Sequence, residues 1–150
     1  MARLEHGKQR ADPLEVAVEA AGIVPRLLAT ALSQQGVPYR LGGALPSSGF
    51  DCSGLVQFVF SQHGAALPRT VVDQFGAGTR VATADAAPGD LVFFATTGRG
   101  ATHVGIVVEH TTFVHAPDAG GVVRVERFDS PYWSTRLVGV RRPLDGQDIR

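Results

Sequence analysis

The sequence changes character near residue 80, and this change limits the folds that the chain can adopt. Before it, apolar residues recur at the spacing of one helix face, which predicts helices over 13–21, 25–35 and 51–63. After it come short runs rich in β-branched and aromatic residues, which predict strands over 90–94, 103–108, 112–115, 122–126 and 137–141. Helices followed by a meandering antiparallel sheet predict an α+β domain.

The length of the chain fits one domain. Its 150 residues can bury one sizeable core but not two, and no internal repeat or interdomain linker is visible. We expect an N-terminal extension over 1–24 that carries the first short helix, a folded domain over 25–144 and a flexible tail over 145–150. Asp51 and Thr70 stand where the N-caps of the third helix and of a short helix over 71–75 are expected.

Charge and hydropathy argue against two classes of partner. Fourteen basic residues balance fourteen acidic ones, without the clustered basic excess of a nucleic-acid binder. The apolar stretch between Glu19 and Arg26 is broken by Gly22 and Pro25, and it falls well below the roughly 18 residues that span a bilayer. We therefore expect no nucleic-acid partner and no membrane span; we also expect a monomer. The N-terminus lacks the apolar core of a signal peptide, so work in the cell envelope or outside the cell needs another delivery route or a leader missing from this sequence.

The single cysteine, Cys52, excludes an internal disulfide and any multi-cysteine metal site. It follows a loop over 36–50 rich in glycine and proline, and it begins a predicted helix. Unpaired N–H groups and the dipole at a helix start favour a thiolate and can hold a developing oxyanion. The pattern predicts a nucleophile with a pKa well below the ordinary thiol value of about 8.5; the alternative is a buried, inert cysteine.

Two histidines are candidates for the base that such a nucleophile needs. His103 and His115 are separated by an even number of residues, so regular strands put both on one face. A hairpin centred near Glu109 would make them direct cross-strand neighbours, one facing the cysteine and the other fixing its tautomer. The alternatives are that each histidine only ends a strand, or that both join His110 in a zinc site. His110 has the opposite parity and no carboxylate completes a ligand set, so we expect no metal and no other cofactor.

Six segments together carry a resemblance to a known family. In this order along about residues 29–142, they resemble the NlpC-type (new lipoprotein C) cell-wall cysteine peptidases. The segments are Pro38-Tyr39-Arg40-Leu41-Gly42-Gly43, Gly49-Phe50-Asp51-Cys52-Ser53-Gly54-Leu55-Val56, Leu67-Pro68-Arg69-Thr70, Pro88-Gly89-Asp90-Leu91-Val92-Phe93-Phe94, His103-Val104-Gly105-Ile106 and Phe113-Val114-His115-Ala116.

The resemblance implies a papain-like fold and hydrolysis of bacterial peptidoglycan stem peptides or muropeptides, at the bond from the γ-carboxyl of D-glutamate to a diamino acid. The matching motifs imply that Cys52 is the nucleophile, His103 the general base and His115 the polar third member. They imply that Tyr39 lies beside the oxyanion, and that Asp51 and Ser53 hold the substrate's amino end.

One position departs from the family pattern, and two further functions stay open. Leu41 stands where many relatives carry an aromatic residue, so this wall of the cleft is expected to differ. The same thiol fold could serve an amidase or acyltransferase, and a catalytically silent wall-binding module is an alternative of another class. We interpret Arg69 as a structural or solvated residue, and for Gly42, Gly43 and Gly54 we expect a backbone requirement.

Overall fold

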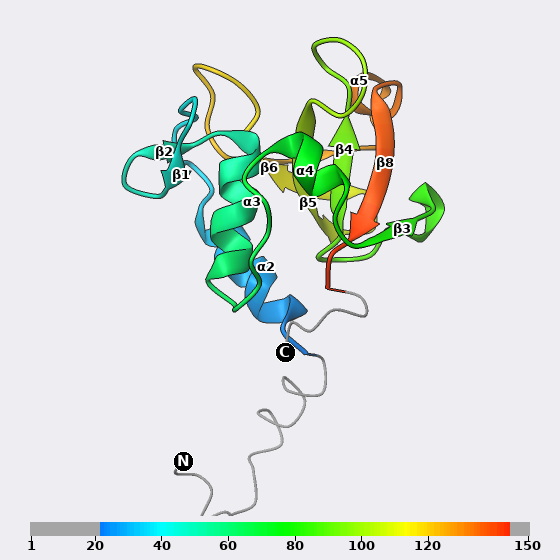
Figure 1. Cartoon of the computed structure of the whole chain (residues 1–150). Coiled ribbons are helices and arrows are strands. Elements are labelled where there is room, and N and C mark those ends of the chain that lie inside the picture. Colours follow the sequence, from blue (N-terminus) through cyan, green and yellow to red (C-terminus); the bar gives the residue numbers. More distant parts are fainter. Residues whose placement is uncertain (1–21, 145–150) are drawn as a thin grey trace, which may run out of the picture.

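The computed structural model describes residues 22–144. The helix predicted over 13–21 and the tail over 145–150 lie outside the described residues. The longer helices come first along the described part and most strands of the main sheet follow them (Figure 1). Its elements are α2 Val24–Ser33, β1 Ala44–Leu45, β2 Gly49–Phe50, α3 Cys52–Ser61, α4 Val71–Phe75, β3 Thr79–Val81, the short 3-10 helix η2 Thr83–Asp85, β4 Leu91–Phe94, β5 His103–Glu109, β6 Thr112–His115, β7 Arg124–Arg127, α5 Pro131–Ser134 and β8 Leu137–Arg142.

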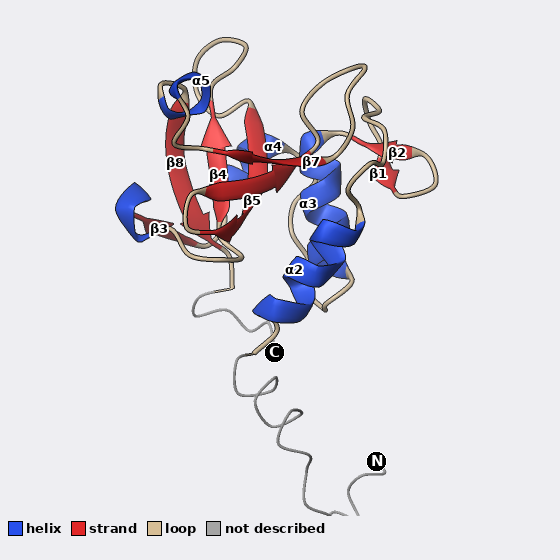
Figure 2. Ribbon diagram, turned by 180° about the vertical axis from the view of Figure 1, so that it is seen from behind, coloured by secondary structure: helices blue, strands red, loops and turns tan. Residues whose placement is uncertain are grey.

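Six of the strands form one sheet, in the order β3-β8-β4-β5-β6-β7, and all neighbours are antiparallel. The helices α2 and α3 lie together beside this sheet, and α3 packs on β5 (Figure 2). The strands β1 and β2 form a separate small hairpin next to the start of α3. The predicted α+β class is confirmed. No helix among residues 22–144 is long and apolar enough to cross a bilayer.

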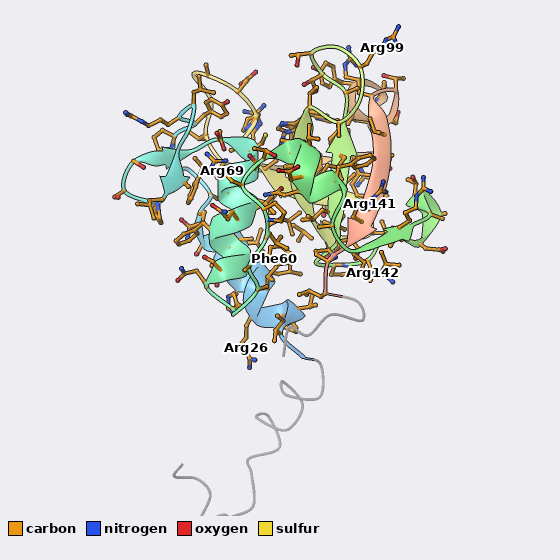
Figure 3. All side chains as sticks on the ribbon, viewed as in Figure 1. Arg26, Phe60, Arg69, Arg99, Arg141 and Arg142 are labelled. Carbon is orange, nitrogen blue, oxygen red and sulfur yellow. The ribbon has the colours of Figure 1, made fainter. Side chains whose placement is uncertain are left out.

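The sheet is covered on both faces, because β4 buries all four of its residues. Leu91 and Phe93 join a core with α2 and α3, to which α3 contributes Phe60 (Figure 3). Val92 and Phe94 point to the other face, where they pack with Trp133 of α5. Burial of these apolar side chains fixes α3 against the sheet. The position of Cys52, at the start of α3, depends on this packing.

The predicted helix starts agree closely with the observed ones. Asp51 has an extended backbone and accepts a hydrogen bond from the Gly54 N–H at 2.8 Å, so it is the N-cap of α3. Thr70 caps α4 in the same way, by accepting from the N–H of Asp73 at 3.2 Å. The short elements β1, β2, β3 and α5 had no prediction, since runs of two to four residues carry little periodicity.

The predicted register between the two histidines is wrong. The turn lies at His110, which has a φ of 37°, and an irregularity between Val107 and Glu109 shifts the pairing. Ile106 therefore pairs with Val114, and His115 lies beside Gly105 rather than opposite His103. The histidine rings still meet across this diagonal, with centroids 5.0 Å apart.

Gly105 leaves the space in which the ring of Phe113 and the Cβ atom of His115 lie. A Cβ at Gly105 would lie 2.5 Å from Cδ2 of Phe113 and 3.0 Å from Cβ of His115. We expect Gly105→Ala to lower the free energy of unfolding by about 1–3 kcal/mol through overpacking, and to displace His115. Urea denaturation measures the first effect. Gly76→Ala is the matched control, because its Cβ would meet only the Asp73 carbonyl oxygen, at 3.6 Å; equal stability of the two variants would contradict this account.

Candidate active site

The nucleophile candidate Cys52 is the first residue of α3 and is half-buried. Burial raises the pKa of its thiol and the charge of Asp51 raises it further, while the N–H groups of Val104, Ser53 and Cys52 itself lower it. The net direction is upward. The prediction of a low thiol pKa is therefore wrong for the free protein, because desolvation of the sulfur outweighs the helix start. The sulfur is in reach of the N–H of Val104, the residue that follows His103.

An ion pair fixes the start of α3. Arg69 donates to both oxygens of the Asp51 carboxylate, from Nη1 to Oδ1 and from Nη2 to Oδ2, each at 3.0 Å. Oδ1 also accepts from the Gly54 N–H at 2.8 Å, and Oδ2 accepts from the Gly42 N–H at 3.0 Å. Four donors thus fill the four acceptor positions of this carboxylate. A planar guanidinium that binds both oxygens holds the cap, and with it Cys52, in one orientation.

Ser53 belongs to the same network and is buried. Its hydroxyl accepts from Nη1 of Arg69 at 2.9 Å. Its carbonyl accepts from the side-chain amide of Gln74, which is fully buried, at 3.1 Å. The same amide donates to the carbonyl of Pro68 at 2.8 Å. Gln74 therefore ties the segment before α4 to the first turn of α3.

The two histidines form a hydrogen-bonded pair inside the protein. Nε2 of His103 lies 2.8 Å from Nδ1 of His115, and the side chain of His115 is fully buried. The ring of His103 stacks on Trp133, with centroids 5.4 Å apart. Burial lowers the pKa of His103 from 6.5 to about 3 and that of His115 to about 4. Both imidazoles are neutral at pH 7, so His103 is free to accept a proton there.

The pair continues to a carboxylate on β7. Nε2 of His115 lies 2.9 Å from Oε2 of Glu126. Glu126 also accepts from Nε1 of Trp133 at 2.9 Å and from Nε of Arg124 at 2.8 Å. A chain of hydrogen bonds therefore runs from His103 through the interior to the sheet edge.

A cleft of about 690 Å³ opens over these groups. Cys52 and His103 both line it, and they do so beside Tyr39. Burial and the nearby charges of Cys52, Asp51 and Asp118 raise the pKa of Tyr39, so its hydroxyl keeps its proton. The remaining lining residues are Leu41, Thr96, Thr97, Thr102, Pro117, Asp118, Ala119, Arg124, Glu126, Ser130, Tyr132 and Trp133.

The structure brings together some of the predicted residues and separates others. Cys52, His103 and Tyr39 share the cleft, and His115 lies directly behind His103. Asp51 and Ser53 do not line the cleft, because both side chains turn toward Arg69. Among residues 22–144 no group of three or more histidine, cysteine, aspartate or glutamate side chains could hold a metal ion.

Sequence reasoning missed three residues that position the site. Arg69 was interpreted only as structural or solvated, and its bidentate hydrogen bonds to the Asp51 cap of α3 were not predicted; the segment Leu67-Pro68-Arg69-Thr70 was the signal available for it. Gln74 and Glu126 act through contacts with residues distant in the sequence, and no local sequence pattern predicts these contacts. The expectation for Gly43 and Gly54 is confirmed: a Cβ at Gly54 would collide with the carbonyl of Gly43, and one at Gly43 with that of Gly49.

Comparison with protein families identifies the domain. The model of the NlpC/P60 family matches residues 36–142. The chain belongs to the NlpC/P60 family. The predicted resemblance is thereby confirmed, and the matched residues include the cleft and the elements that build it.

Curated relatives of this NlpC/P60 chain are named as endopeptidases and hydrolases. It is 43% identical over 114 residues to the bifunctional muramidase/DL-endopeptidase CwlT of Bacillus subtilis, covering 75% of this chain and 34% of that protein. It is 38% identical over 136 residues to the murein DD-endopeptidase MepS/murein LD-carboxypeptidase of Escherichia coli, covering 89% and 70%. The chain thus spans about a third of the length of the first relative.

Solved NlpC/P60 structures share the fold. The peptidoglycan hydrolase RipB of Mycobacterium tuberculosis superposes with a TM-score of 0.72 at 30% identity, covering 85% of this chain and 68% of that one. The predicted papain-like architecture is confirmed.

The buried histidine pair makes the stability of this NlpC/P60 domain depend on pH. Unfolded histidines titrate near 6.5, whereas burial lowers the pKa of His103 to about 3 and of His115 to about 4. Below pH 6.5 the unfolded chain binds more protons, so the free energy of unfolding falls as the pH falls. By pH 5 the loss is on the order of 2 kcal/mol for each histidine.

Urea denaturation at pH 7 and pH 5 measures this loss. A variant in which both His103 and His115 are glutamine should show a smaller difference between the two pH values. The exposed His110 gives the matched control, since His110→Asn should keep the full dependence. A wild-type midpoint that does not change between pH 7 and pH 5 would contradict neutral burial of the pair.

Proposed function

We propose that this protein is a thiol hydrolase that cleaves peptide bonds in bacterial peptidoglycan stem peptides. The observation that carries the proposal is a half-buried thiol at a helix start that shares one cleft with a neutral, hydrogen-bonded imidazole. Supporting it, relatives at 37–43% identity are named DL-endopeptidase, γ-DL-glutamyl hydrolase and murein DD-endopeptidase.

In the proposed mechanism Cys52 is the nucleophile and His103 the general base. His103 takes the thiol proton as the sulfur attacks the carbonyl carbon, because a raised thiol pKa and a neutral imidazole leave deprotonation to the moment of attack. The imidazolium then gives this proton to the departing amine, and a thioester remains on Cys52. Water hydrolyses the thioester, with His103 again as base, and restores the thiol.

The oxyanion of the tetrahedral intermediate requires donors close to Cys52. The N–H groups of Cys52 and Ser53 lie at the start of α3 and near the sulfur. The protonated hydroxyl of Tyr39 lines the same cleft and is the proposed third donor. Donors that are fixed before the reaction stabilise the developing charge without reorganisation.

The bond that we propose is the one between the γ-carboxyl of D-glutamate and the diamino acid. Two relatives named for DL or γ-DL cleavage are 43% and 42% identical to this chain, against 37% and 38% for two named DD-endopeptidases. A silent wall-binding module is less well supported, because a binder gains nothing from burying two neutral histidines behind a thiol. An amidase or acyltransferase would give other products, which the experiment below distinguishes.

The family resemblance implied that Asp51 and Ser53 hold the substrate's free amine, and that role is tested against capping of α3 by the second experiment. Arg69 neutralises the Asp51 carboxylate, and four donors already fill its acceptor positions. The geometry supports capping of α3 by Asp51 better than it supports recognition of the substrate's amine.

The first experiment is mass spectrometry of purified muropeptides after incubation with the protein. We expect new products that end in D-glutamate, and no turnover by Cys52→Ala or His103→Ala. His115→Gln should keep more activity than His115→Ala, because glutamine can still accept a hydrogen bond from His103. His110→Asn is the control, since His110 lies in the exposed turn. Full activity of His103→Ala would exclude the mechanism, and cleavage of a DD or amide bond instead would exclude the proposed substrate bond.

A second experiment separates the two roles of Asp51. It compares an L-Ala-γ-D-Glu-diamino acid tripeptide with its N-acetylated form, in wild type and in Asp51→Asn. We expect the variant to slow both peptides by the same factor, because the lost ion pair with Arg69 disturbs α3 and not one substrate. Asp73→Asn, on the neighbouring α4, controls for a change of charge near the site. A loss confined to the free peptide would instead assign amine recognition to Asp51.

A further inference from the structure

Glu126 lies at the end of the hydrogen-bond chain, and the thiol mechanism above does not use it. Its Oε2 contacts Nε2 of His115 at 2.9 Å, and Nδ1 of His115 contacts Nε2 of His103 at 2.8 Å. Glu126 belongs to β7, where it is separated from His115 by eleven residues and diagonal to it across the ladder. No sequence motif described above includes it.

The direction of each hydrogen bond follows from the chemistry of a carboxylate. An ionised carboxylate only accepts, so Nε2 of His115 must carry the hydrogen. In a neutral imidazole the other nitrogen then holds a lone pair, so Nδ1 of His115 accepts. Nε2 of His103 is therefore the donor in the 2.8 Å contact, and Nδ1 of His103 is left with the lone pair. That nitrogen is the one free to take a proton from Cys52.

Glu126 is held as a carboxylate by three donors. Trp133 donates to Oε1 at 2.9 Å, and Arg124 donates to Oε2 at 2.8 Å, beside His115. Burial alone raises the pKa of Glu126, but the hydrogen bonds from Trp133, Arg124 and His115 bring it below its ordinary value. Because Glu126 stays ionised at neutral pH and can only accept, each hydrogen bond from His103 through His115 to Glu126 has a fixed donor and acceptor.

The negative charge of Glu126 also favours transfer of the Cys52 thiol proton to His103. The negative charge of Glu126 raises the pKa of both His103 and His115, against the larger effect of burial. Two other charges face this group: Arg124 lowers the pKa of His115, and Asp118 raises it. Without Glu126 the imidazolium on His103 would form in a buried site with no anion in its hydrogen-bond chain.

We propose that Glu126 is a positioning residue, which sets the tautomers of His115 and His103 so that Nδ1 of His103 is the base, and which stabilises the imidazolium formed there. The inference rests on the proposed thiol mechanism. The Cys52 proton moves to Nδ1 of His103, while Nε2 of His103 and Nε2 of His115 keep their protons. No proton reaches Glu126, and the Nδ1 proton later leaves with the amine product.

The test uses alkylation of Cys52 by iodoacetamide, which needs no substrate. Glu126→Gln has the same shape, but its amide can offer N–H groups to His115 and reverse the chain. We expect this variant to alkylate about 10- to 100-fold more slowly at pH 7, by analogy with the loss of carboxylate partners that orient metal-ligating histidines. The apparent thiol pKa from the pH profile of alkylation should rise. In turnover, kcat should fall while KM stays unchanged.

Two further variants keep the test decisive. Glu109→Gln makes the same chemical change on the exposed end of β5 and should alkylate at the wild-type rate. Arg124→Gln removes the cation that shares Oε2 with His115, on a side chain that is 47% exposed, so it should fold and shift the apparent thiol pKa downward. Opposite shifts for Glu126→Gln and Arg124→Gln support the proposal, even if Glu126→Gln is less stable.

The positioning role of Glu126 would be overturned if Glu126→Gln alkylated at the wild-type rate. It would also be overturned if Arg124→Gln left the apparent thiol pKa of Cys52 unchanged. These outcomes are separate from those of the proposed function. If muropeptides are not cleaved at all, alkylation still reports on the relay. If they are cleaved and Glu126→Gln alkylates like Glu109→Gln, only the inference about Glu126 fails.

Discussion

The 2.8 Å hydrogen bond between His103 and His115 is the interaction on which the site depends. It joins the first residue of β5 to the last residue of β6, and it buries two imidazoles that would otherwise prefer water. Two backbone features make it possible. The irregular turn at His110 shifts the register, and Gly105 leaves room for the ring of Phe113 and the Cβ atom of His115. Because both rings are neutral, each can donate from one nitrogen and accept at the other.

The second half of the site is built at the start of α3. The bidentate pair between Arg69 and Asp51 fixes the cap, and Gln74 holds the carbonyl of Ser53. The helix is in turn packed against β5 by a core that includes Phe60. Cys52 of α3 and His103 of β5 therefore lie on two elements whose relative position is fixed by the hydrophobic core. A rigid scaffold positions reactive groups in this way.

The sequence predicted the elements of this site better than its contacts. Cys52 at a helix start and two histidines on neighbouring strands follow from local patterns, and both were found. The direct pairing of the histidines was wrong, because a register depends on turn geometry that hydrophobic alternation does not encode. The predicted shift of the Cys52 thiol pKa was wrong in direction, because the burial that raises this pKa depends on tertiary packing. Arg69 and Glu126 were missed for the same reason, since each acts on a partner from another element.

The most direct measurement is long-range ¹H–¹⁵N NMR of the histidine side chains in the free protein at pH 7. Glu126 accepts from His115, so both histidines should be neutral, each with its proton on Nε2 and a lone pair on Nδ1. Assignment by single His→Gln variants identifies the two rings. Resonances of a doubly protonated imidazolium on His103, or a proton on Nδ1 of His115, would contradict the arrangement.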